Sequence, residues 1–195
     1  MRSAHPFDQC STGVRVRPPV RRRRRRGQGG HGTYVPTVPK GQDFTTGDLG
    51  DWSGAKIAKE GDNAFLRAES KVDTGPLYLT VTHPLARVKG DDISPIALRY
   101  RLPFADGGDW CYAKVSLTDS EKRRWSAYVA TKPTASWQRL ALERKDFRRD
   151  DGDKGSAGLP QDAALTAFSM VVRKGKTKAP VAAVLEIDDV ALGGR

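Results

Sequence analysis

Short apolar runs, divided by clusters of turn-forming residues, follow one another from about Asp43 to Leu192. The clusters include DGG, RRDDGDKGSAG and RKGKTKAP, and the runs are rich in β-branched and aromatic residues. Short strands with such separators are typical of antiparallel sandwiches. No window shows sustained helical periodicity, and strands do not alternate with helices as in a parallel sheet. The sequence therefore predicts an all-β fold, an antiparallel β-sandwich, with strands in AFLRAES (64–70), LYLTVT (77–82), PIALRYRLPF (95–104), DWCYAKVSL (109–117), RWSAYVAT (124–131), WQRLALERKDF (137–147), LTAFSMVVR (165–173) and AVLEIDDVAL (183–192).

Alternation with a period of two assigns a face to each side chain in three of these runs. The apolar members, which we expect to face the core, are Leu98, Tyr100, Leu102, Cys111, Ala113, Val115, Leu117, Trp125, Ala127 and Val129. The outward positions include aromatic and basic residues, namely Arg99, Arg101, Trp110, Tyr112, Lys114 and Tyr128. If strands that are neighbours in the sequence are also neighbours in the sheet, these six residues form one surface.

An outward surface of this composition suits a sugar. Flat aromatic rings pack against the apolar C–H faces of a sugar, and basic side chains donate hydrogen bonds to its hydroxyl groups. Two other interpretations remain open. The aromatic side chains pack beneath a loop or another domain, or the surface is an ordinary solvent-exposed face, since tyrosine and tryptophan are common in strands.

Residues 1–42 differ in composition from the rest of the chain. They hold ten basic residues, among them the six consecutive arginines Arg21 to Arg26, against one acidic residue, Asp8. The remaining 153 residues hold 24 basic and 22 acidic residues, so the formal net charge of +11 comes mainly from the first segment. Rich in Arg, Pro and Gly, this segment lacks the apolar side chains that form a core. We expect a disordered leader over 1–42 and a single domain over 43–195.

Two interpretations of the leader stay open. Its arginines neutralise phosphates, giving non-specific binding to nucleic acid or other polyanions. Alternatively, the leader is a solvated extension without function, or translated sequence upstream of the true start. Neither the apolar core of a secretion signal nor a membrane span is visible.

Catalytic and metal-binding motifs are not found. The sequence contains no G-x-S-x-G, H-E-x-x-H or Walker-type loop. Its two cysteines, Cys10 and Cys111, lack the spacing of a disulfide framework or a metal site. Glycosidase chemistry needs two opposed carboxylates, and the acidic residues are too numerous for the sequence to exclude such a pair. The prediction is nevertheless a protein that is not an enzyme.

The order of several motifs resembles a known family. The domain opens with DFTTGDLGDWSG (43–54), continues with SWQRLALERKDF (136–147) and closes with LEIDDVAL (185–192). This order resembles the β-jelly-roll carbohydrate-binding modules of the galactose-binding-domain-like type found on bacterial glycoside hydrolases. It is also similar to the complex I intermediate-associated protein domain. The resemblance covers about 150 residues and implies a jelly-roll topology for the sandwich.

The resemblance also implies roles for individual residues. Those that match its structural positions are Phe44, Trp52, Trp137, Phe147, Leu185, Ile187, Val190 and Leu192. Asp188 matches an aspartate that helps to bind a structural calcium ion in many such modules, and Asp43 is a nearby second ligand. Calcium prefers several oxygen ligands, but Thr45 stands where the family has a glutamate. An Asp-Asp pair at a strand end also serves to bond turn amides.

Together, these observations predict a non-catalytic module that binds a poly- or oligosaccharide through its outward aromatic and basic face. The alternative is a structural or adaptor sandwich that contacts another protein or an attached enzyme. The resemblance implies a secreted or extracellular protein that works with an associated glycoside hydrolase. Since no signal is visible, a misassigned start is a further hypothesis, which mass spectrometry of the native N-terminus would test.

Overall fold

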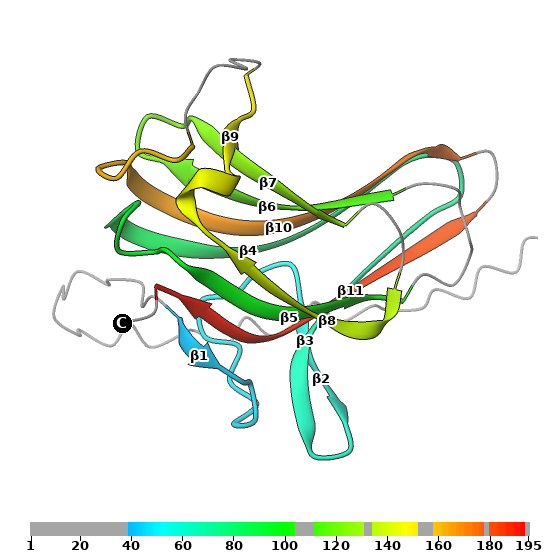
Figure 1. The fold of residues 1–195 in the computed structure, drawn as a ribbon. Helices are drawn as coiled ribbons and strands as arrows, with labels where there is room; N and C mark the ends of the chain where they lie inside the picture. The colour runs from blue at the N-terminus through cyan, green and yellow to red at the C-terminus, as the bar shows by residue number, and fades with distance from the viewer. Residues whose placement is uncertain (1–38, 104–110, 131–133, 152–157, 178–179, 194–195) are drawn as a thin grey trace, which may run out of the picture. The chain divides into compact units, whose positions relative to one another are not determined.

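The computed structural model describes residues 39–103, 111–130, 134–151, 158–177 and 180–193 (Figure 1). Residues 1–38, which make up most of the predicted leader, therefore lie outside the described residues. Within the described ranges the fold is all-β, apart from the short 3-10 turn η1 at Arg144–Asp146. The strands are β1 (Lys40–Gln42), β2 (Lys56–Glu60), β3 (Asn63–Val72), β4 (Gly75–Lys89), β5 (Ile96–Leu102), β6 (Cys111–Asp119), β7 (Arg124–Ala130), β8 (Thr134–Leu142), β9 (Arg148–Arg149), β10 (Ala164–Thr177) and β11 (Val181–Leu192).

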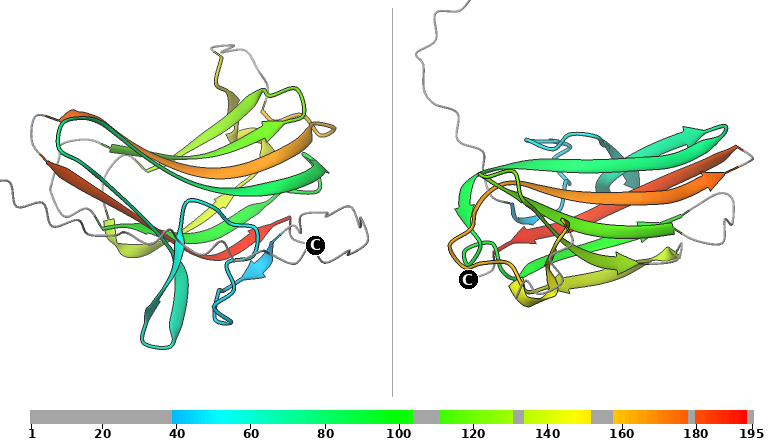
Figure 2. Two further views of the ribbon diagram at one scale, coloured as in Figure 1. Left: turned by 180° about the vertical axis from the view of Figure 1, so that it is seen from behind. Right: turned by 90° about the horizontal axis from the view of Figure 1, so that it is seen from above.

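The strands form two antiparallel sheets packed face to face, which confirms the predicted jelly-roll sandwich. The first sheet has the order β2-β3-β11-β5-β8, with β1 paired to β11, and the second has the order β4-β10-β6-β7-β9. The chain passes from one sheet to the other between β5 and β6, so these neighbours in the sequence lie in different sheets. Figures 1 and 2 show the second sheet curved, with its concave side turned away from the first sheet.

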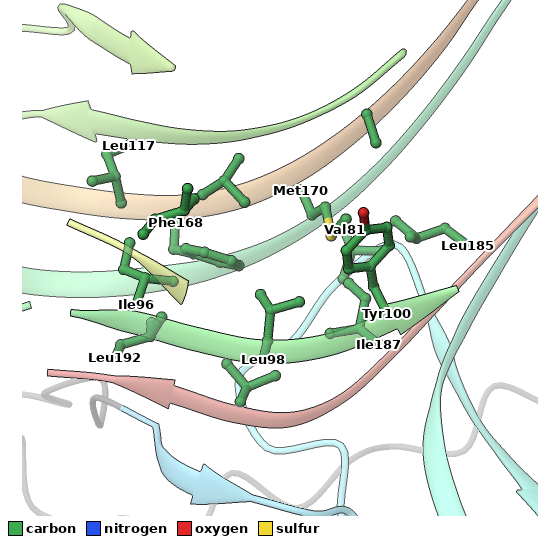
Figure 3. Close-up of a cluster of buried hydrophobic side chains, with 14 of the residues drawn as sticks. Val81, Ile96, Leu98, Tyr100, Leu117, Phe168, Met170, Leu185, Ile187 and Leu192 are labelled. Carbon is green, nitrogen blue, oxygen red and sulfur yellow. The ribbon is translucent and has the colours of Figure 1, made fainter. Parts of the chain in front are cut away.

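The core lies between the sheets and comes from the alternation that the sequence displays. In β5 the side chains of Leu98, Tyr100 and Leu102 are buried, and Arg99 and Arg101 between them are partly exposed. Figure 3 shows how the side chains of the two sheets meet. The predicted inward residues whose side chains are described are all buried except Val129, which is partly buried. The positions predicted as structural are buried as well, apart from the half-buried Trp137.

A buried carboxylate holds the turn between β6 and β7. Asp119, only 1% exposed, accepts hydrogen bonds at Oδ1 from the backbone N–H groups of Glu121 and Arg123, both at 2.9 Å. Its Oδ2 accepts the Arg123 Nε–H at 2.7 Å and the Trp125 indole N–H at 3.4 Å. Burial acts to raise the pKa of Asp119, but these hydrogen bonds outweigh it and hold the pKa below its ordinary value of 3.8.

We expect Asp119→Asn to lower the free energy of unfolding by about 2 kcal/mol at pH 7, because Arg123 loses its charged acceptor. A carboxyl whose pKa is lowered by folding stabilises the protein above its unfolded pKa, and this stabilisation is lost as pH falls through the folded value. The difference in the free energy of unfolding between wild type and Asp119→Asn should therefore become smaller as the pH falls below about 3.8. Urea unfolding of both proteins at pH 7 and pH 3 measures it, and an equal difference at both values would contradict the assignment.

Candidate functional site

The outward residues predicted to form one surface are divided between the two sheets. Tyr112 and Lys114 lie on β6 and Tyr128 on β7, all in the second sheet. Arg99 and Arg101 lie on β5, in the first sheet. The condition for a single surface, that β5 and β6 pair with each other, is not met because β5 pairs with β11 and β8. The sixth residue, Trp110, lies outside the described residues.

The concave side of the second sheet carries three tyrosines and two cations. We call this surface the tyrosine face and define it by Tyr78 on β4, Arg173 on β10, Tyr112 and Lys114 on β6, and Tyr128 on β7. Strand pairing aligns them, because Tyr78 lies opposite Arg173, Arg173 opposite Tyr112, and Lys114 opposite Tyr128. The neighbouring inward residues of these strands, such as Leu77, Val115 and Val172, lie in the core.

The tyrosines of this face are open to solvent. Tyr78 is 52% and Tyr128 is 66% exposed, and they are the two exposed large hydrophobic side chains among the described residues. The ring of Tyr112 packs edge-on against that of Tyr128, with centroids 5.3 Å apart and an angle of 68° between the planes. Edge-to-face pairs hold each other in place. This contact orients the rings of Tyr112 and Tyr128 relative to each other.

The cations of the tyrosine face differ in their partners. Lys114 Nζ lies 2.7 Å from Asp150 Oδ2, so a carboxylate next to β9 neutralises its charge. Arg173 Nη1 donates a hydrogen bond to the Tyr112 hydroxyl oxygen at 3.3 Å, and its guanidinium lies 5.1 Å from the centre of the Tyr78 ring. The two tyrosines thus hold Arg173 between them. The hydrogen bond from Arg173 to Tyr112 is the main cause of the raised pKa of Arg173.

Sequence reasoning missed Tyr78 and Arg173, although both lie in predicted strands. The alternation of LYLTVT places Tyr78 on the other side of its strand from the buried Leu77, Leu79 and Val81. The same alternation places Arg173 on the other side of its strand from the buried Val172. Each residue could therefore be assigned an outward face from the sequence. That both join Tyr112 depends on the pairing of β10 with β4 and β6, which joins segments far apart in the chain.

On the outer face of the first sheet, arginines are paired with buried acids. The carboxylate of Glu186 is fully buried. Its Oε1 lies 2.6 Å from Arg67 Nη1, and its Oε2 accepts a hydrogen bond from Arg101 Nε. Asp188 is also fully buried, and its Oδ2 lies 2.6 Å from Arg99 Nη2. We call these five residues the arginine–acid network. Its arginines already have partners of opposite charge, which limits what they offer to a ligand.

Aromatic rings cover part of this network. The guanidinium of Arg101 lies 4.8 Å from the centre of the Trp137 ring and 5.3 Å from that of Phe65. Phe65 and Trp137 also contact each other edge-on, with ring centroids 5.4 Å apart. Cation–π contacts of this kind fix side chains as well as adding packing energy. Trp137 therefore packs against the protein's own residues, in agreement with its predicted structural role.

The two carboxylates expected to bind calcium are engaged within the protein. Asp188 contacts Arg99, and its Oδ1 accepts the backbone N–H of Asp189 at 2.9 Å. Asp43 Oδ1 accepts the backbone N–H and the hydroxyl of Thr45, at 3.1 and 2.9 Å, and these bonds lower the pKa of Asp43. Among the described residues, no group of three or more His, Cys, Asp and Glu side chains is placed to hold a metal ion. As placed here, these residues do not fit the expected calcium site.

A membrane-spanning helix is not found among the described residues. Comparison of the sequence with protein-family models finds no match. Comparison with curated proteins finds no match either.

Comparison with solved structures finds the same sandwich. The non-crystalline cellulose specific carbohydrate-binding module CBM28 is 9% identical with a TM-score of 0.54, covering 82% of this chain and 96% of that one. A family 11 carbohydrate-binding module of the Clostridium thermocellum cellulase Lic26A-Cel5E is 14% identical with a TM-score of 0.52, over 83% and 97% of the two chains. A Clostridium thermocellum family 11 module in complex with a β-1,3-1,4-mixed-linked tetrasaccharide is 16% identical with a TM-score of 0.51, over 78% and 92%. The chain therefore has the β-jelly-roll sandwich fold of these carbohydrate-binding modules.

Proposed function

We propose that this protein is a non-catalytic carbohydrate-binding module that holds a poly- or oligosaccharide on its tyrosine face. One observation carries the proposal: strand pairing brings Tyr78, Tyr112 and Tyr128 together on the outward side of one sheet, and two of them are largely exposed although they are large and aromatic. Aromatic rings gathered on one exposed surface, rather than scattered singly, are typical of a binding site. The shared fold with carbohydrate-binding modules supports the same class of ligand.

Binding would combine two physical contributions. The tyrosine rings pack against the C–H faces of the sugar rings, removing apolar surface from water. The phenolic hydroxyls and the cations Lys114 and Arg173 donate hydrogen bonds to sugar oxygens, which fixes the orientation of the chain. No bond is made or broken in this process. Trp110, one position before β6, is proposed to extend the same aromatic surface.

The central test replaces Tyr128, the most exposed of the three rings. We expect Tyr128→Ala to weaken retention in polysaccharide affinity gels by about tenfold or more, as loss of an aromatic hot spot does. Its melting temperature should change little, because the ring is 66% exposed. Tyr128→Phe is the matched control, since it keeps the ring and should retain most of the binding.

Three outcomes are informative. If Tyr128→Ala and the parent are retained equally on a polysaccharide that binds the parent, the tyrosine face is not the binding site. If the Trp137→Ala variant loses retention instead, the ligand lies on the other sheet. If a broad panel of glycans gives no retention of the parent, the adaptor function, in which the same exposed rings contact another protein, becomes the better explanation.

A further inference from the structure

Arg173 is an exposed cation without a carboxylate partner among the described residues. Its guanidinium is held at Tyr78 and Tyr112 by a cation–π contact and a hydrogen bond. The arginines on the opposite sheet differ, because Arg67 and Arg101 both contact the buried Glu186. Within the described ranges, Arg67, Arg99 and Arg101 of the first sheet are therefore paired with buried acids, whereas Arg173 on the tyrosine face is held by two tyrosines and has no carboxylate partner.

The rest of the described tyrosine face does not supply the missing negative charge. The two carboxylates next to β9 are already used, Asp150 by Lys114 and Asp151 by Arg149 at 2.5 Å. The outer side of β7 adds a further cation, because Arg124 is exposed at its beginning. The net charge that a ligand would meet on the described part of this face is thus positive.

A guanidinium in this setting favours an anion over a neutral hydroxyl. It presents several N–H donors in one plane, which match the two oxygens of a carboxylate or sulfate, and only one donor is used by Tyr112. The contacts with Tyr78 and Tyr112 restrict the side chain before binding, so less conformational entropy is lost when an anion is bound. An arginine guanidinium stays charged at physiological pH, and the hydrogen bond to Tyr112 raises the pKa of Arg173 further.

We propose that the ligand of the tyrosine face is an acidic polysaccharide, whose carboxylate or sulfate groups pair with Arg173 while its sugar rings pack on the tyrosines. This inference rests on the proposed function and specifies its class of ligand. It separates this protein from a module that recognises only neutral sugar surfaces. The shared chemistry is a negatively charged oxygen group attached to a sugar ring.

The test compares polymers that differ in charge on the same backbone. Carboxymethyl cellulose is paired with hydroxyethyl cellulose, and dextran sulfate is paired with dextran, so the two pairs distinguish carboxylate from sulfate. Affinity gels with the full-length protein give the ratio of dissociation constants for the neutral and the acidic member of each pair. We expect a ratio of about ten or more for at least one pair, as charge-assisted hydrogen bonds provide.

The control must account for the basic residues 1–42, which attract any polyanion. Arg173→Gln and Arg139→Gln each remove one positive charge from the full-length chain and leave that segment intact. Arg139 is exposed on β8, in the other sheet, and makes no ion pair within the described ranges. We expect the neutral-to-acidic ratio to fall by about tenfold in Arg173→Gln and to stay close to the parent value in Arg139→Gln. Arg173→Lys, which keeps the charge but loses the planar donors, should lie between the two.

Several results would overturn the inference. Equal falls in Arg173→Gln and Arg139→Gln would assign the charge preference to the whole molecule or to residues 1–42. Equal binding of the neutral and acidic polymers, with loss in Tyr128→Ala, would leave the proposed function standing without an acidic ligand. Failure of every polymer to bind the parent, in a broad glycan panel as well, would overturn both proposals. Equal melting temperatures of the two glutamine variants ensure that the comparison reports on binding.

Discussion

Replacing Glu186 with glutamine is expected to lower the free energy of unfolding by about 3 kcal/mol, as removal of one partner from a buried ion pair does. Glu186 is fully buried, and each of its two oxygens accepts a hydrogen bond from a different arginine, Arg67 or Arg101. Glutamine has the same shape, but its NH₂ group would point a donor at one of these guanidinium groups. The loss is at the lower end of the usual range because Arg67 keeps Glu69 and Arg101 keeps Glu60.

The matched control is Glu69→Gln on the same sheet. Glu69 also binds Arg67, at 2.5 Å, but its side chain is 47% exposed. Water screens such a pair, so its loss should lower the free energy of unfolding much less than the loss of Glu186 does. Urea unfolding at pH 7 measures both variants. Equal changes in the two would contradict the stabilising role assigned to the buried Glu186 pair.

The Glu186→Gln variant also tests whether Arg101 contacts a ligand. If the arginine–acid network is structural, Glu186→Gln should retain polysaccharide binding at temperatures well below its melting point. A loss of retention in folded Glu186→Gln would instead support the sequence-based prediction that Arg99 and Arg101 contact the ligand. The two sheets can thus be examined independently, because the tyrosine face lies on the other one.

The sequence predicts the inner and outer sides of the strands because alternation is a local property. In β5 and β6, Leu98, Tyr100, Val115 and Leu117 are buried as expected. Which side chains of a strand face the core follows from the alternation within that strand alone. Which distant strand it pairs with does not follow from the same residues. In the three runs to which alternation was applied, the inward residues could therefore be predicted one by one.

The composition of each surface could not be predicted in the same way. Arg101 pairs with Glu186, and Arg99 with Asp188, because β5 and β11 are neighbours in register although they are over 80 positions apart. In the sequence, the acids of LEIDDVAL indicate a calcium site or a turn. In the structure, Glu186 and Asp188 are the counter-ions of Arg101 and Arg99, two arginines that the sequence left available to a sugar. Tyr78 and Tyr112 likewise meet only through β10.

Replacing Trp52 with alanine is expected to lower the free energy of unfolding by about 4 kcal/mol, as loss of a large buried aromatic side chain does. Trp52 is 3% exposed and packs edge-on against Phe44, His83 and Phe168, with ring centroids 6.2, 4.9 and 5.8 Å away. Its indole N–H donates a hydrogen bond to Gln42 Oε1 at 2.9 Å. The ring therefore joins the loop before β2 to β4 and β10, and its removal would leave a cavity in the core.

Trp137→Ala is the contrasting substitution, since it removes the same side chain from the outer face of the first sheet. Trp137 is only half-buried and contacts Phe65 and Arg101 at the surface. Water can replace the ring there, so a loss of about 1–2 kcal/mol is expected, which reflects its aromatic and cation–π contacts. Thermal unfolding should separate the variants, with Trp52→Ala lowering the melting temperature by roughly 10 °C and Trp137→Ala by much less. Similar shifts would mean that Trp52 lies outside the cooperative core, and that the loop carrying it unfolds separately from the sandwich.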